Sequence, residues 1–214
     1  MFRRLIRHGA AVLIYSLVGF TASANNWQAF DQNSAWLQQL SMGQEGLYRA
    51  HFNQARHLQI MQQPLLSSGE VILKAEQGLI WQQLKPFQQT LVVSASQVSQ
   101  YDRDAQPMQL PVAAQQMIQA WAPMMQQVIL GQWSALEQRF EVRLAEGSNI
   151  EHWQMQLTPR DQQMQAALAN IELSGGQQLQ DIAIYQQNGD VLRIELEQQA
   201  WQALNPQQQS WLND

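Results

Sequence analysis

The chain of 214 residues has no cysteine and a formal net charge of −5 at pH 7, and these two properties exclude several classes of protein. Without cysteine it can form no disulfide, no thiolate zinc site and no cysteine nucleophile. An acidic chain without clusters of Lys and Arg is a poor candidate for binding nucleic acid or an anionic membrane surface. The 41 glutamines alternate with apolar residues instead of forming tracts, so we interpret them as neutral surface positions on regular structure.

The first 24 residues have the pattern of a secretory signal peptide. Three arginines precede an uncharged apolar run over residues 9–20, and residues 22–24 read Ala-Ser-Ala. The run is shorter than the roughly 20 residues that a helix needs to cross a bilayer, so an uncleaved anchor is the less favoured alternative. We expect cleavage after Ala24 and a single soluble domain over residues 25–214, located in a bacterial periplasm. That domain has 9 Lys and Arg against 17 Asp and Glu.

Residues 27–42 are predicted to form the first helix of this domain. Their apolar side chains are spaced by three, seven and three positions, which suits one broad face of a helix. Gly43 follows and suits a C-cap, because glycine readily adopts the left-handed conformation that is common there. The apolar residues of the face are Trp27, Phe30, Leu37 and Leu40.

From residue 48 the apolar period changes to two, which predicts antiparallel strands. Pro64 and the Ser67-Ser68-Gly69 stretch predict a loop after the first strand. Gln77-Gly78 predicts a hairpin turn. The strands of this region are expected over residues 48–54, 70–76, 79–84, 90–95 and 97–101.

A second, unusually apolar helix is predicted from Pro111 to about Leu130, because proline suits a first helical position. Pro123 is expected to kink or split this helix, since a proline inside a helix removes a hydrogen bond and clashes with the preceding turn. The methionines of the helix give a soft apolar surface of the kind used where a partner's shape varies. A short helical piece is expected over residues 133–138.

The remainder of the chain predicts a meander of strands, each apolar on one face, with Asn188-Gly189 as a strong hairpin signal. Two helical segments are too few to cover eight to ten strands, and an antiparallel sheet must bury its apolar face. A sheet that curves back on itself, with the helices over its open mouth, satisfies this requirement. The predicted fold class is therefore α+β, mainly antiparallel β, with a strongly curved, incomplete half-barrel and a helical lid.

Several segments carry a resemblance through their order and spacing: Tyr48-x-Ala50-x-Phe52-x-Gln54, residues 68–74, residues 79–81 followed by Pro86 and residues 91–94, residues 153–159, and residues 178–182 with the hairpin that follows them. Together they resemble the periplasmic outer-membrane lipoprotein carrier family, the LolA-like proteins, over essentially the whole exported domain. The resemblance implies an incomplete antiparallel barrel around an apolar cavity, with helices as a lid. LolB and the lipid-binding mycobacterial lipoproteins share that fold.

The resemblance also implies a role and partners. Members of the family carry acylated lipoproteins from an inner-membrane donor to an outer-membrane acceptor, without a cofactor. We expect a monomer that binds an acylated lipoprotein or another lipid and does not insert stably into a membrane. The family often has a basic residue followed by Pro after the second strand, where Arg helps to latch the lid. Here Lys74 is followed by Ala75 and Glu76, so the latch is not carried over, and the chain is more similar to a divergent branch of the family.

The residues themselves offer no catalytic or metal-binding constellation, and we predict that the protein is not an enzyme. The sequence has no G-x-S-x-G motif around a serine, no H-E-x-x-H motif and no P-loop. His51 and His57 are six residues apart on one predicted strand, about 20 Å, which is too far for one metal ion. With His152, they are interpreted as surface or edge residues. A lipid-directed enzyme would need a polar constellation inside the cavity, whereas the expected inward positions are almost entirely apolar.

Binding without bond making is the function that this pattern favours. The hypothesis is a periplasmic carrier that holds acyl chains in an apolar cavity and moves them toward the outer membrane. The alternative is an interaction module on the same fold, with a filled core and no lipid cargo. The residues predicted to line the cavity and the lid are Tyr48, Phe52, Val71, Leu73, Leu79, Trp81, Leu91, Val93, Met117, Trp121, Met124, Met125, Trp153, Met155, Leu157, Ile182 and Ile184.

Overall fold

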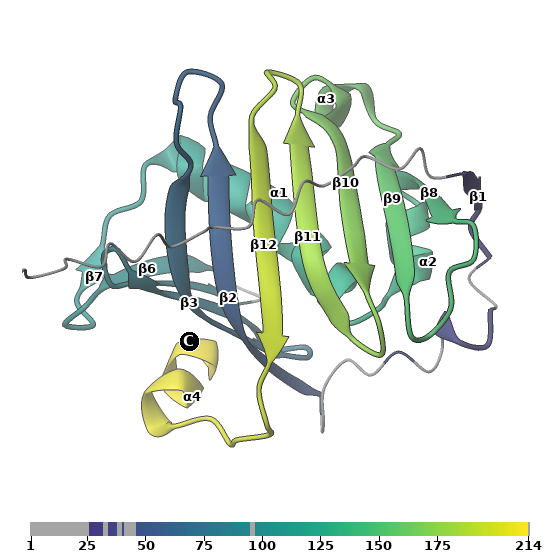
Figure 1. Cartoon of the computed structure of the whole chain (residues 1–214). Helices are drawn as coiled ribbons and strands as arrows, with labels where there is room; N and C mark the ends of the chain where they lie inside the picture. The colour runs from purple at the N-terminus through teal and green to yellow at the C-terminus, as the bar shows by residue number, and fades with distance from the viewer. Residues whose placement is uncertain (1–25, 32–33, 38–39, 41–45, 95–96, 214) are drawn as a thin grey trace, which may run out of the picture.

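The computed structural model describes residues 26–31, 34–37, 40, 46–94 and 97–213. The predicted signal peptide, its cleavage position after Ala24 and the predicted cap at Gly43 lie outside the described residues. Twelve strands form a single sheet in which every pair of neighbours is antiparallel, in the order β1-β8-β9-β10-β11-β12-β2-β3-β4-β5-β6-β7 (Figure 1). The strands are β1 (Trp27–Ala29), β2 (Leu47–His57), β3 (Leu65–Lys74), β4 (Gly78–Lys85), β5 (Gln89–Ser94), β6 (Val98–Asp102), β7 (Pro107–Met108), β8 (Phe140–Ala145), β9 (Trp153–Pro159), β10 (Leu168–Gly175), β11 (Leu179–Gln186) and β12 (Val191–Gln198).

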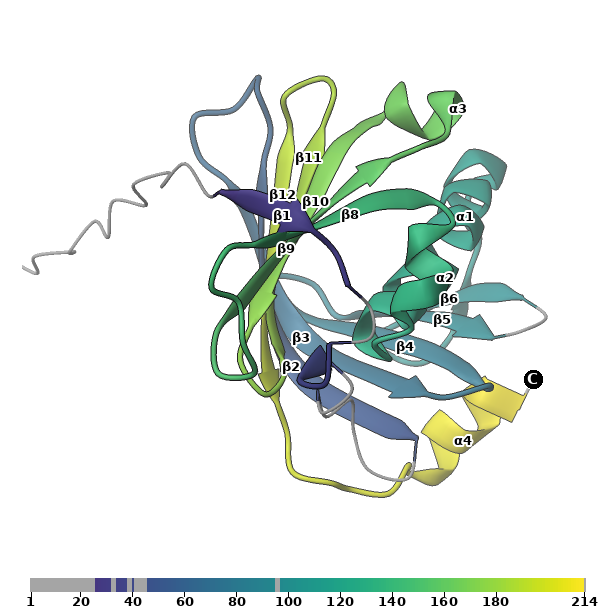
Figure 2. The same ribbon diagram turned by 90° about the vertical axis from the view of Figure 1, so that its right-hand side faces the viewer.

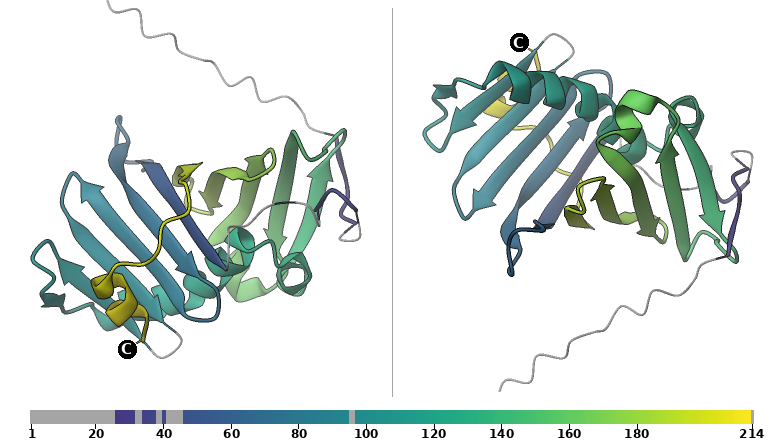
Figure 3. Two further views of the ribbon diagram at one scale, coloured as in Figure 1. Left: turned by 90° about the horizontal axis from the view of Figure 1, so that it is seen from below. Right: turned by 90° about the horizontal axis from the view of Figure 1, so that it is seen from above.

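The sheet is strongly curved but does not close into a barrel, because β1 and β7 remain as its two edges. Helices α1 (Val112–Ile129) and α2 (Trp133–Glu137) lie on its concave side, while α4 (Pro206–Asn213) lies on the outer side of β4 (Figure 2). Seen from above, α1 runs across the strands (Figure 3). The predicted fold class, an incomplete antiparallel half-barrel with few helices, is confirmed.

Alternation along the strands decides which side chains enter the interior. In β9, Trp153, Met155 and Leu157 are fully buried, while Gln154 and Gln156 between them point to the other face and are partly exposed. Successive strand residues point to opposite faces, so this one-face pattern both places the core and explains the glutamines. The surface role predicted for these two glutamines agrees with their position.

The helix predicted over residues 27–42 is wrong in its described part. Trp27, Gln28 and Ala29 form strand β1, which pairs with Ala145, Leu144 and Arg143 at the edge of the sheet. The open edge of β8 offers unpaired backbone groups, and pairing with them overrides the local helical pattern. Further along, Leu37 and Leu40 are buried in the core through short turns; a helical spacing of apolar residues therefore does not require a helix.

The loop predicted at Ser67-Ser68-Gly69 is also wrong, because β3 begins at Leu65 and includes all three residues. A register irregularity in the β3–β4 ladder separates Ser68 from Gly69. A Cβ atom at Gly69 would overlap the backbone carbonyl of Gln82 on β4. The glycine thus permits close approach of two strand backbones, which is a common reason for glycine inside a strand.

The central helix forms as predicted but is not split at Pro123. Helix α1 is continuous from Val112 to Ile129, and Pro123 lies on its exposed side. Because proline has no N–H, the carbonyl of Gln119 has no intrahelical donor. Gln119 is exposed as well, so water can bind that carbonyl and the helix can continue. The short helix predicted near Trp133 is confirmed as α2.

Two short helices were not predicted from the sequence. Asp161 caps α3 (Gln162–Gln165) by accepting hydrogen bonds from the backbone N–H groups of the second and third residues that follow it. Asn205 does the same for α4, accepting from the backbone N–H of Gln208 at 2.8 Å. No helix within the described part of the chain has the length and apolar character needed to cross a membrane.

Candidate functional site

The concave face of the sheet is a continuous apolar surface built from rows of side chains that cross the strands. One row runs from β2 to β6 and a second from β12 to β8, each defined by directly paired residues. All members of both rows are buried. They are Tyr48, Leu73, Leu79, Val93 and Val98 in the first row, and Ile194, Ile182, Leu173, Met155 and Leu144 in the second.

An aromatic pair lies near the middle of this face. Phe52 is paired across the ladder with Gly69, which has no side chain, and its ring stacks on Trp81 with 4.2 Å between the ring centroids. Phe52 is buried whereas Trp81 is partly exposed. The pair therefore forms a flat apolar surface that joins the interior to its rim.

Helices α1 and α2 cover the concave face. From α1, Met124 and Val128 are buried in the same apolar cluster as the strand residues, and Met125 packs against it. In α2, Trp133 makes an edge-to-face contact with Trp153 of β9, 6.3 Å between ring centroids. Helix α1 has no charged residue in its 18 positions, so its cover over the apolar surface brings no charge to the interior.

The structure brings the predicted cavity and lid residues together as one apolar cluster, wherever it describes their side chains. The side chains of Met117 and Trp121 are outside the described part. The three partly buried members are Trp81, Leu91 and Met125. The buried members are Tyr48, Phe52, Val71, Leu73, Leu79, Val93, Met124, Trp153, Met155, Leu157, Ile182 and Ile184.

Several members of the same cluster are absent from the predicted set. Ile194 and Leu196 alternate on β12 in the same way as the predicted residues of the neighbouring strands, so their period-two pattern is a signal that identifies them. Leu37 and Leu40 belong to the cluster as well. Their spacing indicates burial but gives no information on which face of the sheet they cover.

Two polar atoms lie buried at one end of this apolar interior. The hydroxyl of Tyr48 and the Oε1 atom of Gln198 have no hydrogen-bond partner among the described residues. Burial raises the pKa of the Tyr48 phenol from 10.0 to about 12. The hydroxyl therefore stays protonated at neutral pH and is available as a donor.

The outer face of the sheet carries a second, smaller apolar cluster beneath α4. Leu212 of α4 is buried there with Ile72, Ile80 and Val92 of β3, β4 and β5. The ring of Trp211 stacks on Tyr101 of β6 at 5.2 Å. Helix α4 therefore shields apolar residues that would otherwise face solvent on the convex side.

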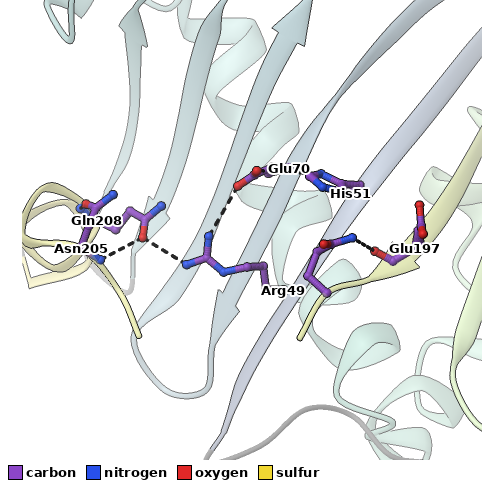
Figure 4. Close-up of polar contacts among 7 residues, drawn as sticks. Arg49, His51, Glu70, Glu197, Asn205 and Gln208 are labelled. Atoms are coloured by element: carbon purple, nitrogen blue, oxygen red, sulfur yellow. Dashed lines mark hydrogen bonds and ion pairs between the residues drawn. The ribbon is translucent and has the colours of Figure 1, made fainter. Parts of the chain in front are cut away.

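A polar network also holds α4 against β2 and β3 (Figure 4). Arg49 donates to Glu70 at 3.5 Å and to the side-chain oxygen of Gln208 at 3.2 Å. The same oxygen accepts from the backbone N–H of Asn205 at 3.1 Å. Glu70 also lies 3.8 Å from His51. Arg49 is a charged link between the sheet and the C-terminal helix, and its site is on the convex face.

A groove of about 310 Å³ lies beside this network, on the outer side of the sheet. It lies between the ends of β2 and β3 and the C-terminal segment, and so is separate from the concave interior. Trp201 at its border is half exposed. The residues that line it are Leu47, Lys74, Gln77, Trp201, Ala203, Leu204, Gln209 and Asn213.

Among the residues that the structure describes, no group of three or more His, Asp or Glu side chains is placed to bind a metal ion. His51, His57 and His152 are exposed. The arrangement instead offers a large apolar surface on the concave face. The fold and this interior define the class as an incomplete antiparallel β half-barrel whose concave face is covered by helices.

The family model described as outer membrane lipoprotein carrier protein LolA matches residues 46–208. The chain therefore belongs to the LolA family of outer membrane lipoprotein carrier proteins. A comparison with curated proteins finds no match.

Two solved structures are similar in fold. The LolA superfamily protein NE2245 from Nitrosomonas europaea is 11% identical, with a TM-score of 0.42, and the match covers 80% of this chain and 94% of that one. MucB in the Pseudomonas aeruginosa MucA/MucB complex is 17% identical, with a TM-score of 0.45, over 81% of this chain and 58% of that one.

Proposed function

We propose that this protein is a periplasmic carrier that binds the acyl chains of a lipoprotein or lipid on its concave face and moves them toward the outer membrane. The observation that supports the proposal is the large apolar cluster on the concave face, which extends from β8 to β6 and is covered by the uncharged helix α1. Its partners would be an inner-membrane donor and an outer-membrane acceptor, as in the family to which it belongs. The role involves no catalysis, and export would remove residues 1–24.

Burial of the cargo supplies enough free energy for such a role. Each methylene removed from water contributes about 0.8 kcal/mol, so one acyl chain of ordinary length gains roughly 10 kcal/mol before the costs of binding. In the structure, inward side chains such as Phe52 and Met155 are already buried. Cargo must therefore displace α1 from part of the concave face, and the closed state competes with the loaded one.

The methionines of α1 suit this exchange. Met124 and Met125 are unbranched and polarizable, and such side chains repack around apolar groups of different shape. When α1 moves away, apolar surface becomes exposed unless cargo covers it. Release would then require an acceptor that binds the acyl chains more tightly or stabilises the open state.

Analysis of co-purified lipid tests the proposal. The mature protein is purified from its producing cells without detergent, and bound lipids are extracted and identified by mass spectrometry. We expect acylated molecules in near-stoichiometric amounts and saturable binding of a fluorescent fatty acid by the delipidated protein. A folded protein that contains no lipid and also fails to bind the probe would contradict the proposal.

A second candidate is an interaction module with a filled interior and no lipid cargo. The observation that favours it is the low exposure of the inward side chains, together with the position of the 310 Å³ groove on the convex face. The same experiment separates the two functions, because a module binds protein partners while its interior takes up no acyl probe.

A further inference from the structure

Tyr48 and Gln198 lie close together on the concave face although they come from distant parts of the chain. Gln198 pairs directly with Ala50 across the β12–β2 ladder. Tyr48 precedes Ala50 by two residues, so it points to the same face of β2. Diagonal neighbours of this kind on adjacent antiparallel strands are within reach of long side chains. The two residues therefore lie on the same face of neighbouring strands. Figure 1 shows that β2 begins and β12 ends at the same end of the sheet.

Each of the two side chains has a buried polar atom without a partner, and the two atoms do not hydrogen-bond to each other. Neither the Tyr48 hydroxyl nor Gln198 Oε1 has a hydrogen-bond partner among the described residues. A buried polar group without a partner destabilises a protein, because it has given up its hydrogen bonds to water without replacement. The neighbours of Tyr48 in its row, Leu73 and Leu79, are apolar, so they supply none.

The chemistry of these two side chains indicates what could satisfy their polar atoms. The Tyr48 hydroxyl remains protonated and is a hydrogen-bond donor, and the amide of Gln198 presents either a donor or an acceptor because its oxygen and nitrogen exchange by rotation. Tyr48 is 1% exposed, whereas Gln198 is partly exposed. The pair therefore stands at the boundary between the apolar interior and solvent at one end of the half-barrel.

We infer that Tyr48 and Gln198 form a subsite for the ester or amide carbonyl that joins an acyl chain to its polar head. The acyl chain extends from this point over the apolar rows, and the head faces the open end beside Gln198. This inference rests on the proposed function and narrows its ligand class. A pure hydrocarbon, such as an unsubstituted polyene, would leave both polar atoms unpaired, whereas an acyl ester or amide would pair with the hydroxyl.

A pair of matched ligands tests the subsite. A fatty acid methyl ester and an alkane of equal length compete with a fluorescent hydrocarbon for the delipidated, full mature chain. The ester should bind about 5- to 10-fold more tightly than the alkane, which has no acceptor atom, because this factor corresponds to one hydrogen bond. Tyr48→Phe should abolish this preference, and Gln198→Leu should reduce it. Tyr185→Phe is the matched control. Tyr185 follows the inward-facing Ile184 on β11 and therefore points to the outer face, where its hydroxyl donates a hydrogen bond to Glu172.

Each outcome is decisive for one of the two proposals. If the wild-type protein binds neither ligand nor the hydrocarbon, the proposed carrier function fails. If it binds ester and alkane equally, or if Tyr48→Phe retains the preference for the ester, the carbonyl subsite is wrong and the carrier function stands. Since the substitution removes only an unpaired hydroxyl, we expect the variant to fold, and circular dichroism checks this.

Discussion

At the scale of single residues, Tyr48 links the stability of the protein to pH. Burial raises its pKa to about 12 from the unfolded value of 10.0, so the folded state retains the proton more strongly. The corresponding stabilisation is complete below pH 10 and is lost as pH rises from 10 to 12. Two pKa units correspond to about 2.7 kcal/mol. We predict that the free energy of unfolding falls more steeply over this range in wild type than in Tyr48→Phe, as measured by urea unfolding. Parallel curves for the two proteins would contradict the burial of the phenol.

Gly69 is a second residue with a specific structural requirement. A Cβ atom there would overlap the backbone of Gln82, and backbone cannot move aside as a flexible side chain can. We predict that Gly69→Ala lowers the free energy of unfolding by about 2–3 kcal/mol in urea denaturation. Gly147→Ala is the control: its φ of +82° is unfavourable for alanine but no atom lies within 4 Å, and we expect a loss of about 1 kcal/mol. Equal losses would show that β3 and β4 do not approach so closely.

At the scale of elements, the proline inside α1 leads to a prediction about opening. Pro123 is exposed, so replacing it removes no packing and restores the hydrogen bond to Gln119. We predict that Pro123→Ala raises the free energy of unfolding by roughly 1–3 kcal/mol. If α1 must bend away for cargo to enter, the same change slows association of a fluorescent acyl probe several-fold in stopped-flow experiments. Greater stability with an unchanged association rate would contradict the role of α1 as the moving cover.

Helix α4 is expected to stabilise the sheet from its outer side. Leu212 is buried against Ile72, Ile80 and Val92, and deletion of such a side chain loses both burial and packing. We predict that Leu212→Ala destabilises the protein by about 2–3 kcal/mol, measured by denaturant unfolding. Ile60→Ala removes a side chain that is 93% exposed and should change stability by less than about 0.5 kcal/mol. A similar effect for both substitutions would mean that α4 does not pack on the sheet.

Local sequence patterns predict some of the secondary-structure elements, while others depend on contacts with distant parts of the chain. Alternation over five or more residues predicts the strands well, because burial on one face leaves period two in β2 and β9 whatever their partners. Strand β1 has three residues, and its pairing is determined by the distant edge of β8, which local spacing does not contain. Helix α4 has a start signal in Asn205-Pro206, but the eight-residue segment is stabilised by contacts with Ile72, Ile80 and Val92, remote in the sequence.

At the scale of the whole molecule, the curved sheet follows from a need to bury apolar area with few covering helices. Apolar alternation along the strands predicts which residues face inward but not their distances, and the cluster that contains Phe52 and Met155 agrees with that pattern. The alternation does not predict that Tyr48 and Gln198 lie on neighbouring strands, because this depends on β12 pairing with β2 over a separation of about 150 residues. Opening of the interior for a ligand depends on the free-energy difference between the closed state and the loaded state.

Site-specific photo-cross-linking tests the account most directly. A photoreactive phenylalanine derivative replaces Trp81, which stacks on Phe52 in the interior, or the adjacent Gln82, which points to the opposite face of β4. Both variants are produced in the native host, irradiated, and analysed by mass spectrometry for adducts with acyl chains. If the concave face binds acyl chains, we predict acylated adducts at position 81 and none at position 82. Absence of adducts at position 81 in a folded protein, or equal labelling at both positions, would contradict an acyl-binding concave face.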